Sequence, residues 1–78
     1  MAKLRHKLLD LIGEKERELG RRLTQAEIAE AAGVQEATLS RWLKTSFVKR
    51  PDADTVTNLC LYFGVDVGDL LYIDHNAN

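Results

Sequence analysis

Residues 23–44 read LTQAEIAEAAGVQEATLSRWLK, and this stretch decides the fold because it carries the start and stop signals of two short helices. Thr24 and Glu27 have the spacing of a capping box, in which each side chain accepts a hydrogen bond from the other residue's backbone N–H. Gly33 follows the first helix and is typical of a helix C-terminus, since glycine reaches positive φ without strain. We therefore predict two helices joined by a three-residue turn at 32–34.

The turn restricts the side chains around it. Ala29 is small where the two helices approach closely, and Gly33 must take a left-handed conformation that a Cβ atom opposes. Val34, Leu39 and Trp42 are apolar, so we expect them to lock the second helix against the first. For Trp42, a place in the core is favoured over a role as a stacking platform for bases.

Apolar residues at helical spacing predict two longer helices on either side of this pair. One covers residues 2–19 and ends before Gly20. The other covers residues 53–63, with Asp52 as its N-cap residue and Gly64 after its last turn. The apolar stripe of the first consists of Leu4, Leu8, Leu11, Ile12 and Leu19.

The C-terminal part of the chain predicts one more short helix, capped by Asp66 and running through Tyr72. Residues 74–78 are polar and are expected to form a frayed tail. The length of 78 residues allows one domain. The sequence therefore predicts a compact all-α fold of five helices, in a single domain over residues 1–73.

Composition excludes several kinds of protein and site. With 45% hydrophobic and 29% charged residues, the chain is a typical globular domain and not a disordered segment. No apolar run approaches the roughly 18 residues of a membrane span. Cys60, the single cysteine, excludes an internal disulfide and is expected to be a buried thiol. His6 and His75 lack partners at metal-ligand spacing. We expect no metal, cofactor, small-molecule ligand, membrane contact or catalytic activity.

Charge is distributed unevenly along the chain. Residues 1–51 hold all 11 lysines and arginines against 7 acidic residues, a balance of +4. Residues 52–78 hold no lysine or arginine and 5 aspartates, a balance of −5. This asymmetry favours a basic working face and an acidic back, although a plain scatter of charges over a solvated surface is the alternative.

Residues 23–34 together with 38–42 resemble the helix-turn-helix of the phage-repressor (Cro- and Xre-like) family. Residues 63–71, FGVDVGDLL, resemble the end of the same domain. The resemblance covers residues 4–72 and implies a lambda-repressor-like fold. It also implies a sequence-specific DNA-binding transcriptional regulator, cytoplasmic, of bacterial or phage origin and associated with the nucleoid.

The resemblance assigns roles to exposed side chains. The helix over about 35–44 is expected to enter the major groove, while the helix before it lies across the DNA backbone. Base reading is expected from Gln35, Glu36, Thr38 and Arg41, whose side chains match the donors and acceptors of base edges. Phosphate contacts are expected from Thr24, Gln25, Ser40, Lys44, Lys49 and Arg50, with Arg21 and Arg22 as weaker candidates. For Arg41 the alternative is an ion pair with a neighbouring glutamate.

Residues 45–50 depart from the family pattern because a glycine is missing after the recognition helix. Phe47 and Val48 are apolar in this loop, so they either fold back on the core or join a dimer contact. Glu36 is also unusual, since a carboxylate near DNA repels phosphate unless a base amino group receives it.

Double-stranded DNA is the partner that the resemblance implies. It also suggests a homodimer on an inverted repeat with half-sites roughly 34 Å apart. The acidic C-terminal half, Val48 and Tyr72 are candidate dimer contacts. Two alternatives stay open: an antitoxin-like module that binds DNA and masks a toxin, and a protein-interaction domain that does not bind DNA. The net charge of −1 and Glu36 support the second.

Overall fold

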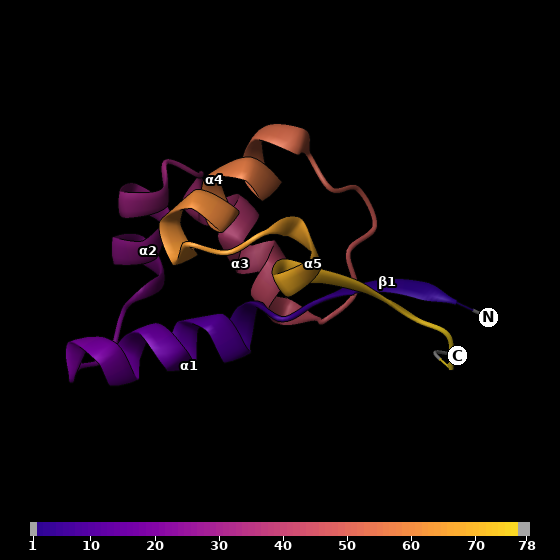
Figure 1. Ribbon diagram of the computed structural model, residues 1–78. Coiled ribbons are helices and arrows are strands. Elements are labelled where there is room, and N and C mark those ends of the chain that lie inside the picture. Colours follow the sequence, from indigo (N-terminus) through magenta and orange to yellow (C-terminus); the bar gives the residue numbers. More distant parts are fainter. Residues whose placement is uncertain (1, 77–78) are drawn as a thin grey trace.

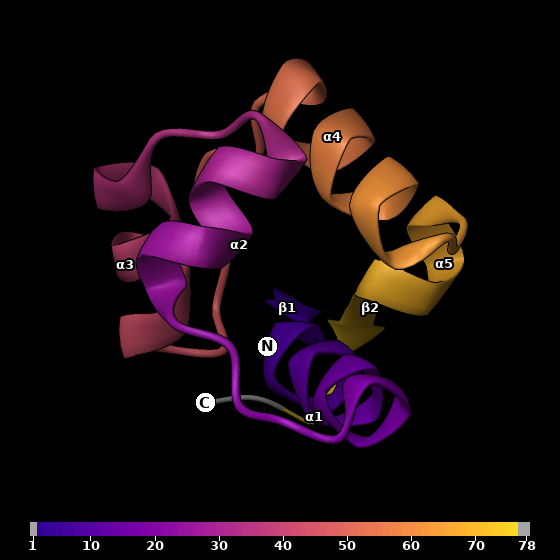
Figure 2. The ribbon, with the colours of Figure 1, turned by 90° about the vertical axis from the view of Figure 1, so that its left-hand side faces the viewer.

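The computed structural model describes residues 2–76, and within them the chain forms five helices and two short strands (Figure 1). In chain order these are β1 Lys3–His6, α1 Leu8–Leu19, α2 Gln25–Ala32, α3 Glu36–Lys44, α4 Ala53–Phe63, α5 Val67–Leu70 and β2 Leu71–Asp74. The helices are arranged around one core, and the two strands, which are the first and last elements, run side by side away from it (Figures 1 and 2).

β1 and β2 pair in antiparallel orientation, with Lys3 opposite Asp74 and His6 opposite Leu71. The domain is therefore mostly helical with a small two-stranded sheet in the described residues, and the all-α prediction was wrong on this point. The physical reason is the separation of the partners, because strands from opposite ends of a chain leave no hairpin signal in the local sequence.

Two predicted helix ends are wrong as a consequence. The first helix was predicted to start near the beginning of the chain, but it begins at Leu8. The last was predicted to run through Tyr72, but it ends at Leu70. Asp74, predicted as the first residue of a frayed tail, pairs in β2, while residues 77–78 of that tail lie outside the described residues. Tertiary pairing thus overrides helical spacing at both ends.

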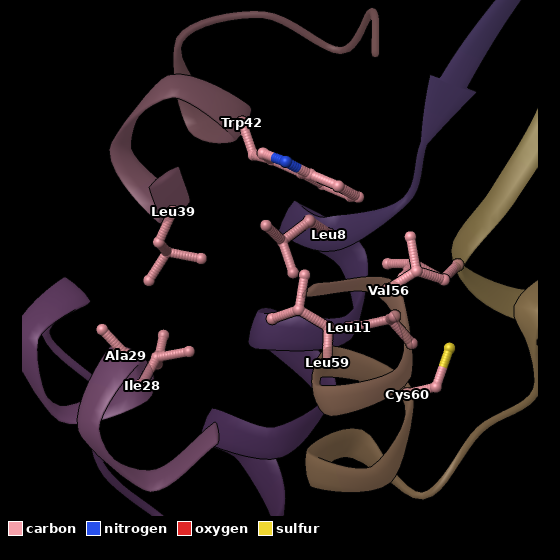
Figure 3. Packing of buried hydrophobic residues seen from close by; sticks show 10 residues of the cluster. Leu8, Leu11, Ile28, Ala29, Leu39, Trp42, Val56, Leu59 and Cys60 are labelled. Carbon is pink, nitrogen blue, oxygen red and sulfur yellow. The ribbon is translucent and has the colours of Figure 1, made fainter. Parts of the chain in front are cut away.

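The core collects the apolar faces of the helices (Figure 3). Each fully buried leucine contributes about 1.5–3 kcal/mol relative to an exposed one. Leu19 was predicted to belong to the first apolar stripe, but it is the last residue of α1 and is 50% exposed, so that assignment was wrong. The side chains less than 2% exposed are Leu8, Ile28, Leu39, Leu59 and Leu70.

The α2–α3 pair follows the sequence prediction closely. The Thr24 hydroxyl accepts the Glu27 N–H at 3.1 Å, and the Glu27 carboxylate accepts the Thr24 N–H at 3.3 Å, which confirms the capping box. Gly33 has φ +76°, and the Val34 N–H donates to the carbonyl of Ala29 at 3.0 Å. The left-handed corner required by the turn is therefore confirmed.

The loop at 45–50 folds back against β1 on the edge that β2 does not occupy. The Val48 N–H donates to the carbonyl of Leu4 at 2.9 Å, and Phe47 forms a bridge with Arg5. The Arg5 guanidinium lies 4.3 Å from the centre of the Phe47 ring, and Val48 packs on the core. Folding back on the core is therefore confirmed for Val48, whereas Phe47 lies against β1.

Candidate nucleic-acid interface

α3 has an apolar side and a polar side. Leu39 and Trp42 are 1% and 8% exposed and face the core, as predicted (Figure 3). The remaining predicted positions of α3 and its N-cap carry polar side chains. Gln35, Glu36, Arg41 and Lys44 are exposed, and Thr38 and Ser40 are half-buried.

Arg41 makes a local contact within α3. Its Nη2 donates to the hydroxyl of Thr38 at 3.3 Å, and within residues 2–76 Arg41 itself forms no ion pair with a glutamate. The alternative of a surface ion pair is therefore absent from this structure. A guanidinium has five N–H donors, so the bond to Thr38 orients the side chain and leaves most of its donors for a partner.

The N-terminus of α2 presents backbone N–H groups near the exposed side chain of Gln25, its first residue. The capping box occupies the hydroxyl and the N–H of Thr24. The box also uses the Glu27 N–H, so the N–H groups of Gln25 and Ala26 remain for an anion, which the helix dipole also favours.

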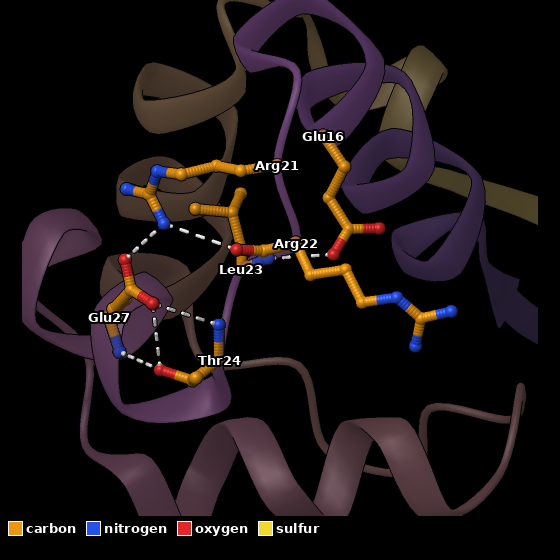
Figure 4. Close-up of polar contacts among 6 residues, drawn as sticks. All are labelled: Glu16, Arg21, Arg22, Leu23, Thr24 and Glu27. Atoms are coloured by element: carbon orange, nitrogen blue, oxygen red, sulfur yellow. Dashed lines mark hydrogen bonds and ion pairs between the residues drawn. The ribbon is translucent and has the colours of Figure 1, made fainter.

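Arg21 is held beside this terminus by Glu27 (Figure 4). The two side chains form an ion pair at 2.8 Å. Hydrogen bonds from the Arg21 guanidinium and then from the Thr24 N–H hold the pKa of the Glu27 carboxyl below its ordinary value. Arg21 was a weak candidate for a phosphate contact, and its guanidinium is paired with the Glu27 carboxylate of the same chain.

A hollow of about 1000 Å³ opens between α3, the loop at 45–50 and the start of α4. Two carboxylates at the start of α4 share this hollow with three cations. One of them, Asp52, accepts the Thr55 N–H at 3.0 Å and thereby caps α4. The polar residues that line the hollow include Gln35, Thr38, Arg41, Lys49, Arg50, Asp52, Asp54 and Asn58.

A family model described as a Cro/C1-type HTH DNA-binding domain matches residues 19–75. The chain belongs to this family. A search of curated proteins and a search of solved structures each found no match. Membership makes DNA the partner of this Cro/C1-type domain. The match begins at Leu19, so β1 and nearly all of α1 lie outside it.

The structure brings some predicted site residues of this Cro/C1-type domain together and separates others. Gln35, Thr38 and Arg41 share the hollow with Lys49 and Arg50. The other predicted residues do not line it: Glu36, Ser40 and Lys44 lie elsewhere on α3, and Thr24 and Gln25 lie at the start of α2.

Sequence reasoning missed two polar residues near this surface. Asn58 donates from Nδ2 to the carbonyl of Gly33 at 3.3 Å, which ties α4 to the turn of the helix-turn-helix. His6 is 6% exposed and bonds to the end of α3. Neither contact leaves a local signal, because each joins residues more than 20 positions apart in the sequence.

Cys60 is buried, as predicted, and its side chain extends from α4 into the hydrophobic core (Figure 3). Burial raises the pKa of its thiol, and the negative charges of Asp66 and Asp69 raise it further. A raised pKa suppresses the thiolate, which is the reactive form of cysteine.

None of the helices in residues 2–76 has the length and apolar character needed to cross a membrane.

Proposed function

We propose that this Cro/C1-type domain is a sequence-specific transcriptional regulator whose α3 enters the major groove of DNA. The observation that carries the proposal is the polar side of α3, which holds Gln35 and Arg41 in solvent while Leu39 and Trp42 anchor the helix in the core. An α-helix fits the major groove, where each base pair presents a distinct pattern of donors and acceptors.

Base reading is proposed for Gln35, Glu36, Thr38 and Arg41. Arginine binds O6 and N7 of guanine, glutamine binds adenine, and glutamate accepts from N4 of cytosine. The hydrogen bond from Arg41 to Thr38 supports this assignment, because it orders the guanidinium before DNA arrives.

Phosphate contacts are proposed for two groups of residues. Gln25 and the free N–H groups at the start of α2 form one group, with Thr24 organising that terminus through its cap. The second group follows the polar side of α3 and the loop after it, and its members are Ser40, Lys44, Lys49 and Arg50. Both groups are expected to make affinity fall as salt rises.

A homodimer on an inverted repeat is proposed as the binding form. Tyr72 and Ile73 in β2 are 38% and 51% exposed, and β2 has one strand neighbour within residues 2–76. A free strand edge with apolar side chains favours association. Val48, an earlier candidate for this contact, packs on the core of its own chain instead. Sedimentation of the protein alone and with DNA measures the oligomeric state.

Selection of bound sites from a random DNA pool tests the proposal directly. We expect one consensus site, and gel-shift titration should give tighter binding to it than to random duplex. Failure of folded protein to retard any duplex at low salt would instead favour a protein-interaction domain.

Two variants then separate base reading from phosphate binding. Arg41→Ala is expected to cost about 1–3 kcal/mol at the selected site and to relax one base preference. Lys44→Ala is expected to weaken binding to all sequences about equally and to flatten the salt dependence. If Arg41→Ala kept both affinity and base preference, the proposed orientation of α3 would be wrong.

A further inference from the structure

His6 is buried at the junction of β1, α1 and α3. Its ring stacks on Trp42 with a distance of 5.3 Å between ring centres. Nε2 lies 2.6 Å from the carbonyl oxygen of Trp42 and 2.8 Å from that of Thr45, while Nδ1 accepts the N–H of Leu8 at 3.1 Å. Both ring nitrogens are therefore engaged with backbone groups.

These partners fix the form of the ring. A carbonyl oxygen only accepts and a backbone N–H only donates, so Nε2 carries the hydrogen and Nδ1 does not. Trp42 lies in the last turn of α3 and Thr45 is its C-cap residue, whereas Leu8 is the first residue of α1. Carbonyls at the end of a helix and N–H groups at its start lack partners within the helix. One side chain therefore serves the end of α3 and the start of α1 together.

α3 ends where Thr45 continues in an extended conformation, with φ −148° and ψ 158°, and the contact of Nε2 with the Thr45 carbonyl lies at this end. The last turn of α3 also carries Arg41 and Lys44. We propose that His6 is a positioning residue for DNA recognition, which sets the orientation of the last turn of α3 by tying it to β1 and α1. The inference rests on the proposed function, since it concerns how α3 meets the major groove.

Two substitutions test separately the contact of His6 with the end of α3 and its contact with the start of α1. In His6→Gln, the terminal amide occupies the place of Nε2 and can donate to α3, but it leaves the Leu8 N–H without an acceptor. In His6→Asn, the side-chain oxygen occupies the place of Nδ1 and can accept that N–H, but nothing reaches α3. His6→Gln thus loses one acceptor and His6→Asn loses one N–H donor, which the carbonyls of Trp42 and Thr45 share, so a purely structural role predicts similar damage from both. His75→Gln, at an exposed position in the described chain, is the matched control.

Binding is measured by gel shift on the DNA site selected by the wild-type protein and on random duplex. We expect His6→Asn to lose about tenfold in affinity for the selected site, the worth of one or two hydrogen bonds, with little change on random duplex. His6→Gln should stay within about threefold of wild type on both, because it retains the contact to α3. Thermal melts check that each variant is folded at the temperature of the titration.

Equal affinities of the two variants for the selected site, or losses that follow only their melting temperatures, would overturn the proposal. If His6→Asn does not fold, His6→Gln decides alone, since a tenfold loss there contradicts the proposal. Amide hydrogen exchange in the free protein separates this inference from the proposed function. Faster exchange in the last turn of α3 in His6→Asn than in His6→Gln supports positioning even if no DNA is bound, and identical exchange refutes it.

Discussion

The α2–α3 pair is held by contacts between residues close in sequence, whereas the β1–β2 pair is held by contacts between residues far apart in sequence. In the first, the cap at Thr24 and the corner at Gly33 lie within a few residues of the atoms they contact. In the second, Lys3 meets Asp74 and the two strands have no turn between them. The comparison teaches that the α2–α3 pair, which is the proposed DNA-binding part, is specified locally, whereas the strand pair is specified by contacts between distant parts of the chain.

Leu70→Ala is the strongest test of whether the two regions form one cooperative unit. Leu70 is fully buried and leads directly into β2, so the truncation should cost about 2–5 kcal/mol and lower the melting temperature of the whole domain. Leu61→Ala, at a side chain that is 75% exposed, is the control and should change stability by less than about 0.5 kcal/mol. Separate melting of the sheet, with the helices unaffected, would break the comparison.

Gly33→Val tests the local specification of the α2–α3 corner. A Cβ atom there would lie 3.9 Å from Asn58, so space is sufficient and the cost comes from the positive φ. We expect a loss of about 1–3 kcal/mol in a denaturant titration. Gly13→Ala, inside α1 and without positive φ, should instead stabilise the protein by about 0.5–1 kcal/mol. A loss of the same size in both variants would contradict the left-handed assignment.

Asp74→Asn removes the charge that joins the two ends of the chain. Asp74 and Arg5 form a 2.6 Å ion pair, and their side chains are 23% and 29% exposed. Solvent screening limits the expected loss to about 0.2–1 kcal/mol, and the difference from wild type should shrink at about 1 M salt. A loss that is unchanged by salt would point to packing in the sheet as the cause.

The smallest effect is expected from the pH dependence of the cap at α2. The pKa of Glu27 is lowered from 4.5, so its contribution to stability is present above that pH and is lost as the pH falls through the lower folded-state pKa. Glu27→Gln should flatten this part of the stability profile, measured by thermal melts in the acid range. Identical profiles for the variant and wild type would show that the ion pair with Arg21 does not contribute.

Much of the α2–α3 region was predictable because its signals are chemical and close together. Thr24, Glu27 and Gly33 each imply a particular backbone geometry, and the structure has all three. The boundaries predicted for α4 are also confirmed. Asp52 is its N-cap residue, as predicted, and its carboxylate accepts a hydrogen bond from the Thr55 N–H. The candidate site residues on α3 could be placed on its polar side for the same reason.

The strands and the contacts of His6 could not be predicted in this way. Leu4 and Leu8 satisfy helical spacing equally well whether or not β2 is nearby, so periodicity favoured the wrong element. The residues next to His6 in the sequence give no indication that its ring contacts Trp42 in α3, 36 positions away. Such contacts depend on the path of the whole chain, which local propensities do not encode.

The antiparallel pairing of the first and last strands has a consequence for the rate of folding. Closing a loop of about 70 residues costs more chain entropy than forming the turn between α2 and α3, so the strand pair is expected to form late. A circular permutant that joins the two strands through a short linker and opens the chain within residues 20–22 would convert this distant pair into a hairpin. Such a chain should collapse faster than the natural one while keeping the same packed interior.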